Sequence, residues 1–284
     1  MKDFKVTFFY TKTTSTSRGK LLDWSNPKVM GILNVTPDSF FDGGVNNSVE
    51  KALLKVKQML VEGVDIIDIG GYSSRSDAID ISEEEEKSRV LPIIIEIRKR
   101  YPDVILSIDT FRGSVAEAAL ESGVNIVNDI TGGVYDATIF EKVAKHKGIY
   151  CMMHMKGTPQ TMKNETEYAD IFCEMIDFFL AQIKKAYQAG IKDIIVDPGF
   201  GFAKTEEQNY LILKYLEVFK LLGLPILIGI SRKSMIYKPL NKTASLALNG
   251  STVLHTIALT HGAHIYRVHD VEEMKEAINL IRKL

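Results

Sequence analysis

Eight short apolar stretches rich in valine and isoleucine recur along the chain, and longer segments with helical periodicity separate them. These stretches occupy residues 28–34, 64–70, 104–109, 124–129, 148–154, 193–199, 225–231 and 263–270. Strands that are apolar on both faces and joined by helices are typical of a parallel sheet with helical crossovers. Eight such units within roughly 250 residues predict a (β/α)8 TIM barrel, an α/β fold.

The predicted domain organisation is a single barrel over residues 28–284, preceded by a short N-terminal extension over residues 1–27. An open doubly wound sheet is the alternative, and it would bind its ligand at one switch point with only some of its strand ends. Among the helical segments, residues 206–223 form one long predicted helix, and Thr205 with Gln208 forms a predicted capping box at its start.

Charge and composition argue against several classes of partner. The formal net charge is −1, which does not favour a nucleic-acid-binding surface. No apolar run approaches the roughly 18 residues of a membrane span, and the first 20 residues lack the pattern of a secretory signal. The two cysteines, Cys151 and Cys173, are expected to be reduced thiols, so we predict a cytoplasmic protein.

Polar and ionisable residues stand at the ends of nearly all the predicted strands. In a barrel the catalytic groups lie at the carboxyl ends of the strands, so these residues are expected to converge on one site. They are Asn34, Asp109, Asn128, Asp129, His154, Asp197, Lys233, Arg267 and His269. Taken singly, several have a structural alternative: Asp68 within its strand as part of a turn with the following glycines, His154 as a core histidine, and Asp197 as a turn residue.

The residue types suit a planar nitrogen heterocycle that carries a phosphate group. Asp109, Asn128 and Asp197 offer acceptors for ring N–H donors, and Lys233 can donate to a ring oxygen or nitrogen. Phe202 can wall a flat ring. Positively charged and hydroxyl groups suited to phosphate or pyrophosphate are also present, namely Ser74, Arg75, Arg267 and His269.

From about Leu21 to the C-terminus the chain resembles the dihydropteroate synthase family. The resemblance rests on the motifs NVTPDSFFDGG, DIGGYSSRS, SIDTFRGSVAEAAL, NIVNDITGG, MMHMKGTPQTM, VDPGFGFAKT, GISRKSMI and YRVHDV, which occur in the family's order. It implies a pterin-binding barrel that condenses 6-hydroxymethyl-7,8-dihydropterin pyrophosphate with 4-aminobenzoate. The implied products are dihydropteroate and pyrophosphate.

The resemblance also implies roles for individual residues. The implied pterin-binding residues are Asp109, Asn128, Ile130, Asp197, Phe202 and Lys233. The implied pyrophosphate-binding residues are Ser74, Arg75, Arg267 and His269. Asn34 matches a position associated with Mg²⁺, the implied cofactor. The implied 4-aminobenzoate residues are Thr36, Phe40 and Ser234, and the catalytic set is Asp38, Lys233, Arg267 and His269.

The loop from Thr36 to Gly44 combines hydrogen-bonding groups with phenylalanines directly after the first strand. We interpret it as a lid, with Phe40 closing on the aminobenzoate ring and Asp38 reaching the metal and a developing positive charge. The family is thought to lose pyrophosphate before the amine attacks. An aromatic amine is neutral near pH 7, so charge stabilisation and positioning would carry catalysis.

The sequence departs from the family after the loop arginine, where Ser76 and Asp77 replace the usual Pro-Gly. Loss of the proline gives that loop more freedom, and we predict reduced affinity for sulfonamides, which mimic aminobenzoate. Ala203 stands where glycine is common, and Lys156 stands where glutamine is common.

Two other functions remain open from the sequence. One is a pterin-binding barrel that presents methyltetrahydrofolate to a corrinoid partner, which would not need Arg75, Arg267 or His269. The other is a non-catalytic pterin-binding homologue, for which the altered loop at Ser76 and Asp77 leaves room. The resemblance further implies a homodimer formed through the outer helices.

Overall fold

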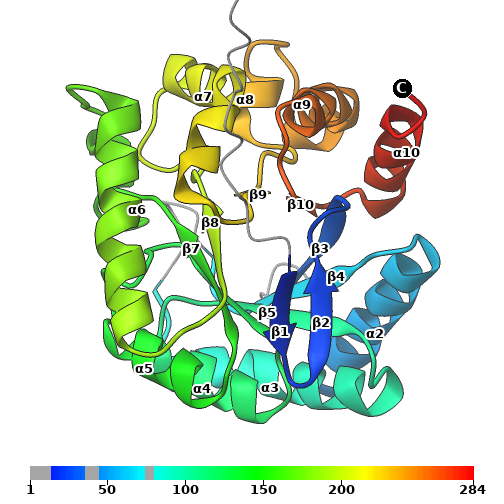
Figure 1. Cartoon of the computed structure of the whole chain (residues 1–284). Coiled ribbons are helices and arrows are strands. Elements are labelled where there is room, and N and C mark those ends of the chain that lie inside the picture. The colour runs from blue at the N-terminus through cyan, green and yellow to red at the C-terminus, as the bar shows by residue number, and fades with distance from the viewer. Residues whose placement is uncertain (1–13, 36–44, 74–79) are drawn as a thin grey trace, which may run out of the picture.

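The computed structural model of the chain describes residues 14–35, 45–73 and 80–284, and within them a parallel barrel forms the centre of the molecule (Figure 1). The eight-stranded sheet has the order β8-β7-β6-β5-β4-β3-β10-β9. Its two ends meet through a parallel bridge between Val196 and Ile226, where the Val196 amide donates to the carbonyl of Pro225 at 3.0 Å. The predicted TIM barrel is therefore confirmed, and the open doubly wound sheet is excluded.

The barrel strands fall inside the predicted stretches. They are β3 (Lys28–Asn34), β4 (Ile66–Gly70), β5 (Ile105–Asp109), β6 (Ile126–Asp129), β7 (Ile149–Met153), β8 (Ile194–Asp197), β9 (Leu227–Ile228) and β10 (Ile265–Val268). Strand β9 is much shorter than its apolar stretch, and Pro225, which precedes it, has no N–H to give to a ladder.

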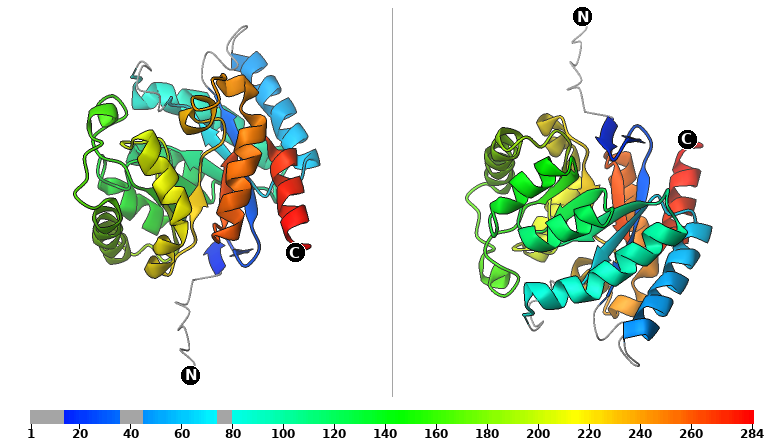
Figure 2. Two further views of the ribbon diagram at one scale, coloured as in Figure 1. Left: turned by 90° about the horizontal axis from the view of Figure 1, so that it is seen from above. Right: turned by 90° about the horizontal axis from the view of Figure 1, so that it is seen from below.

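Helices surround the strands as an outer ring (Figure 2). Those described are α2 (Val45–Val61), α3 (Glu83–Arg100), α4 (Gly113–Glu121), α5 (Thr138–Lys145), α6 (Ile171–Gln188), α7 (Glu206–Lys214), α8 (Ser234–Tyr237), α9 (Leu248–Thr260) and α10 (Val271–Ile281). The capping box of Thr205 and Gln208 is confirmed at the start of α7. The single helix predicted over 206–223 is wrong, because α7 ends at Lys214 and a 3₁₀ helix, Leu216–Leu222, follows it.

A two-stranded hairpin, β1 (Thr14–Ser17) and β2 (Lys20–Asp23), precedes the barrel and is dark blue in Figure 1. Leu22 and the following Trp24 pack in one buried cluster with apolar residues that alternate along the barrel strands. Trp24 is 1% exposed, and its Nε1 donates to Ser15 Oγ at 2.9 Å. The hairpin thus contributes to the apolar filling of the barrel, while the domain boundary at residues 27 and 28 stays a prediction.

Alternate side chains along each barrel strand point to the same face, so the face that carries this apolar filling also carries the candidate site further along the strands. The buried cluster contains Ile66, Ile126, Ile195 and Ile265. Side chains two residues further along a strand point to the same face. Those positions are Asp68, Asn128, Asp197 and Arg267, so the polar residues lie on the interior face of the barrel, toward the carboxyl ends of the strands. Among the described residues, no helix is both long and apolar enough for a membrane crossing.

Candidate active site

The strand register brings three predicted site residues, Asn34, Asp109 and Asn128, to one level of the barrel. Asn34 is paired with Gly70, Gly70 with Asp109, and Asp109 with Asn128. Because parallel strands carry equivalent positions side by side, the carboxyl ends of β3 to β6 form a continuous row of site residues. Gly70 contributes no side chain to this row and leaves space between its two neighbours.

Arg267 lies on β10, the last barrel strand in the sequence, and is hydrogen-bonded to Asp109 of this row. Its Nε donates to Asp68 Oδ2 at 2.6 Å and its Nη2 donates to Asp109 Oδ2, also at 2.6 Å. Asn128 Nδ2 donates to the same oxygen of Asp68 at 3.1 Å. Asp68 is fully buried and holds two site side chains, so it belongs to the site and does not serve merely to order the turn that follows β4.

In this interior cluster the single guanidinium of Arg267 faces two carboxylates, those of Asp68 and Asp109, so the negative groups outnumber the positive one. Burial raises the pKa of Asp109, with the charge of Asp68 adding to the effect and Arg267 opposing it. Burial also raises the pKa of Asp197, which Lys233 opposes. Although burial lowers the pKa of Arg267, Asp68 and Asp109 together raise it, so the guanidinium stays charged.

Lys233 lies against the loop that follows β8. Its Nζ donates to the Phe200 carbonyl and lies 4.5 Å from the centroid of the Phe202 ring. A Cβ on Gly201 would approach Lys233 Cδ to 3.3 Å, and Gly201 has a φ of +80°, so this close approach suits glycine. Burial lowers the pKa of Lys233 to about 8, while Asp197 opposes the shift.

Apolar residues form a wall beside these charged groups. Ile130 and Phe202, both predicted to line a ring-binding pocket, belong to one cluster with Tyr72, Phe111 and Met153. The rings of Tyr72 and Phe111 meet edge to face with their centroids 5.0 Å apart. A wall of this kind next to buried hydrogen-bonding groups is typical of a site for a planar heterocycle.

The surroundings of Asn34 fit the predicted magnesium site. A Cβ built on Gly70 would lie 3.6 Å from Asn34 Oδ1 and 3.7 Å from Asp109 Oδ2, so both oxygens border the same space. Amide and carboxylate oxygens are hard ligands suited to Mg²⁺, which usually takes few protein ligands and is completed by phosphate oxygens and water. The residues present therefore fit the ion.

The remaining predicted residues are placed as follows. His269 follows β10, and its backbone N–H donates to Ser231 Oγ at 3.2 Å. Ser234 is the first residue of α8 and is partly buried. The other predicted site residues, with the two altered loop positions, lie outside the described residues: Thr36, Asp38, Phe40, Ser74, Arg75, Ser76 and Asp77.

Comparison with known proteins agrees with this geometry. The sequence model of the family described as "Pterin binding enzyme" matches residues 30–269. The dihydropteroate synthase of Escherichia coli (strain K12) is 43% identical over 267 residues, which cover 93% of this chain and 94% of that protein. The chain belongs to the dihydropteroate synthase family of pterin-binding enzymes.

Solved structures of dihydropteroate synthases agree with the fold in detail. The Yersinia pestis enzyme, solved in complex with a sulfonamide drug, superposes with a TM-score of 0.89 at 40% identity, covering 95% of this chain and 98% of that one. The Xanthomonas albilineans enzyme, solved with 4-aminobenzoic acid, superposes with a TM-score of 0.88 at 34% identity, covering 96% and 98%.

Lys204 was not predicted as a site residue, and it is buried in this member of the dihydropteroate synthase family. Its Nζ donates to the carbonyls of Phe202 at 2.9 Å, Gly199 at 3.1 Å and His154 at 3.3 Å. It also lies 3.1 Å from His154 Nδ1. Lys204 therefore fixes the loop that carries Phe202, and its signal in the sequence is a lysine directly after the glycine-rich DPGFGFA.

His154 does not face the site as a free catalytic group. It is buried, and burial followed by the nearby Lys204 charge lowers its pKa. Its ring packs edge to face on Phe178 with the centroids 5.0 Å apart. The core-histidine interpretation of His154 is therefore confirmed.

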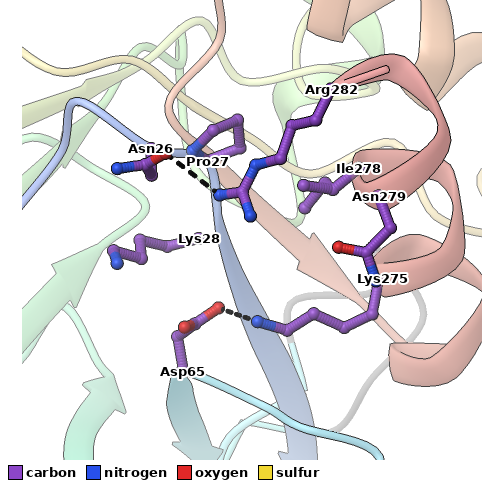
Figure 3. Close-up of a pocket in the computed structure, with 8 residues that line it drawn as sticks. All are labelled: Asn26, Pro27, Lys28, Asp65, Lys275, Ile278, Asn279 and Arg282. Atoms are coloured by element: carbon purple, nitrogen blue, oxygen red, sulfur yellow. Dashed lines mark hydrogen bonds and ion pairs between the residues drawn. The ribbon is translucent and has the colours of Figure 1, made fainter.

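A separate pocket of about 360 Å³ lies at the opposite end of the barrel, beside the start of β3 and helix α10 (Figure 3). Two pairs of its lining side chains meet across the pocket: Lys275 Nζ lies 2.5 Å from Asp65 Oδ2, and Arg282 Nη2 donates to Asn26 Oδ1 at 3.2 Å. The amino ends of barrel strands usually serve stability, so we assign no catalytic role to this pocket.

Proposed function

We propose that the chain is a dihydropteroate synthase, which joins 6-hydroxymethyl-7,8-dihydropterin pyrophosphate to 4-aminobenzoate and releases dihydropteroate and pyrophosphate. The observation that carries this proposal is the interior cluster in which Arg267 bridges Asp68 and Asp109, beside Asn128. It supplies acceptors for a heterocycle and a fixed cation for its phosphates. The names of the relatives support the same reaction.

The pterin would lie between the acidic row and the apolar wall. Asp109, Asn128 and Asp197 would accept hydrogen bonds from the ring's amino and N–H groups, and Lys233 would donate to a ring acceptor. Phe202 and Ile130 would cover the ring faces. Buried groups of this kind bind tightly only a ligand that satisfies them, which makes the cluster selective for a heterocycle with matching donors.

The pyrophosphate would lie toward Arg267 and His269. Arg267 uses Nε and Nη2 for the two aspartates, and none of the described residues accepts a hydrogen bond from its Nη1. We propose that this nitrogen, with His269, Ser74 and Arg75, binds the phosphates. Asn34 would hold Mg²⁺, which when bound neutralises phosphate charge and so makes pyrophosphate a better leaving group.

The chain's own residues would then act mainly through charge and position. The bond between the pterin methylene carbon and the pyrophosphate oxygen breaks, leaving positive charge spread into the dihydropterin. The lone pair of the 4-aminobenzoate amine forms the new bond to that carbon, and the nitrogen releases one proton to water or to the departing pyrophosphate. Buried carboxylates near the ring would stabilise the developing cation without reorganising. We propose that Asp38 also stabilises this charge and that Phe40 contacts the aminobenzoate ring; both residues lie outside the described part of the chain.

The decisive experiment measures pyrophosphate release by the purified chain with the dihydropterin pyrophosphate and Mg²⁺, with and without 4-aminobenzoate. Release that depends on aminobenzoate, with dihydropteroate formed, is the expected result. Binding of the pterin without release would favour the non-catalytic homologue. Asp38→Ala should lower kcat far more than it weakens pterin binding, and unchanged turnover in that variant would refute the role given to Asp38.

We also propose a homodimer formed through the outer helices. Exposed apolar side chains on α6, α7 and α9 support this, among them Leu180, Tyr187, Leu211 and Val253. Light scattering on the purified chain tests it, and a monomer at micromolar concentration would contradict it. The cytoplasmic location stays a prediction.

A further inference from the structure

Two residues that the proposed chemistry does not use stand next to residues that it does. Arg232 directly precedes Lys233, and Asp270 directly follows His269. Arg232 Nε donates to Asp270 Oδ2 at 2.9 Å, and Nη2 donates to Asp270 Oδ1 at 2.6 Å. This bidentate pair joins the segment after β9, which carries Lys233 and Ser234, to the segment after β10, which carries His269.

The backbone at Arg232 is strained and held from several sides. Its φ is +55°, a left-handed conformation that is unfavourable for a residue with a Cβ. Its N–H donates to Ser251 Oγ at 3.0 Å, and its Nη1 donates to the carbonyl of Ser245 at 3.0 Å. Such strain persists only where the surroundings over-determine the conformation, and it is common beside functional groups.

A second link connects the same two segments. The backbone N–H of His269 donates to Ser231 Oγ at 3.2 Å, so Ser231 and Arg232 hold His269 and Asp270 respectively. Two adjacent residues of one segment therefore hold two adjacent residues of the other. This arrangement fixes the separation of the segments that carry Lys233 and His269.

We propose that Arg232 and Asp270 are positioning residues, a clamp that holds Lys233 and Ser234 in register with Arg267 and His269. The proposal rests on the proposed function, in which one segment binds the pterin and aminobenzoate and the other binds the pyrophosphate. The reacting carbon lies between these two ends of the substrate. An error of about 1 Å in their relative position can cost about 100-fold in rate.

The chain contains a matched control at the other end of the barrel. The control is the ion pair between Lys275 and Asp65, which Figure 3 shows. Its side chains are 25% and 27% exposed, against 27% and 16% for Arg232 and Asp270. It joins α10 to the residue before β4 and contacts no candidate site residue among those described. Lys275→Met thus removes an ion pair of similar exposure without touching the two segments.

The experiment compares the full-length chain with Asp270→Asn, Arg232→Lys, the double variant and Lys275→Met. Asp270→Asn should lower aminobenzoate-dependent kcat by about 100-fold, and Lys275→Met should leave it within about twofold. Arg232→Lys keeps the charge but loses the two-point contact, so it should retain part of the activity. The double variant should fall no further than Asp270→Asn, because both changes remove one interaction.

Calorimetric binding of the dihydropterin pyrophosphate separates failure of this proposal from failure of the proposed function. If the wild-type chain shows no turnover, the proposed function fails. The clamp is then tested by the affinity for the dihydropterin pyrophosphate, which Asp270→Asn should weaken by about tenfold. Turnover and binding within twofold of wild type in both single variants would overturn the clamp. So would an equal loss in Lys275→Met. If Asp270→Asn does not fold, Arg232→Lys decides by the same measurements.

Discussion

Arg267 Nε donates to Asp68 Oδ2 at 2.6 Å, joining residues that are 199 positions apart in the chain. The two side chains come from adjacent parts of the barrel, because β10 and β4 both pair with β3. A charged residue expected to bind substrate is thus fixed from within by a buried carboxylate, and the barrel pre-organises it before substrate arrives.

Asp68→Asn should destabilise the fold and disturb the site together. The carboxylate has 0% exposure and accepts from Arg267 and Asn128. Removing one partner of a buried ion pair costs about 3–5 kcal/mol because the other charge is left uncompensated. Asp109 still pairs with Arg267, so we expect about 2–4 kcal/mol by urea denaturation. Pterin affinity should fall as well.

Ser107→Ala provides the control for that substitution. Ser107 is paired with Asp68 in the strand register, is also fully buried, and its hydroxyl has no hydrogen-bond partner in the described part of the chain. Replacing an unsatisfied buried hydroxyl by a methyl group should be neutral or slightly stabilising. An equal loss of stability in both variants would mean that packing at this level, and not the ion pair, dominates.

Trp24→Ala should cost about 3–5 kcal/mol of unfolding free energy, the usual range for a large buried aromatic residue. Trp24 packs with the interior cluster at the amino end of the strands, whereas the site lies at the carboxyl end. The values of KM should therefore stay unchanged at temperatures where the variant is folded. Leu21→Ala, at a neighbouring position that is 69% exposed, should change stability by less than about 0.5 kcal/mol. A similar effect of both substitutions would contradict the packing role of the hairpin.

Lys204 should give the wild-type chain a pH-dependent stability that Lys204→Met lacks. Burial lowers the pKa of Lys204 to about 7, with Asp197 opposing. Between about pH 7 and the ordinary pKa of lysine, Lys204 is protonated in the unfolded state but not in the folded state. The stability of wild type relative to Lys204→Met should therefore rise with pH over this range, by at most about 1.4 kcal/mol per unit. Denaturation curves at pH 6, 8 and 9.5 test this, and a difference that falls with pH would contradict it.

Much of the fold could be predicted because the strands are apolar on both faces and short. The strand predicted over 28–34 is observed as β3 with the same bounds, Lys28–Asn34. The stretch 225–231 shrank to Leu227–Ile228, since burial alone does not supply ladder hydrogen bonds. The helix predicted over 206–223 breaks at Tyr215, where neither glycine nor proline marks the change. There, tertiary packing overrides local preference.

The site was predictable where it depended on strand ends and not where it depended on contacts between distant segments. Asp109, Asn128 and Asp197 follow from the rule that barrel sites lie at carboxyl ends. Asp68 was ambiguous because the glycines after it also suggest a turn. The bonds of Lys204 to three carbonyls, and of Arg232 to Asp270, require loops whose separation no local pattern specifies.

Ala203→Gly should stabilise the chain or leave it unchanged, against the usual direction of that substitution. Ala203 has a φ of +49°, in the left-handed region where a Cβ costs roughly 1–2 kcal/mol. Glycine removes this cost. The substitution also loses a small buried methyl group and adds conformational freedom to the unfolded state, and these two effects together destabilise the folded state by about 1 kcal/mol. This is the physical reason that a glycine suits the position.

Ala118→Gly, within α4, is the control for an alanine in ordinary helical conformation and should destabilise by about 1 kcal/mol. The difference between the two substitutions in urea denaturation should therefore be about 1–2 kcal/mol in favour of Ala203→Gly. Ala203 accepts a hydrogen bond from Tyr168 through its backbone carbonyl at 2.9 Å, which the substitution keeps. Equal destabilisation at both positions would mean that the buried methyl of Ala203, packed with Tyr72 and Phe111, outweighs the backbone strain.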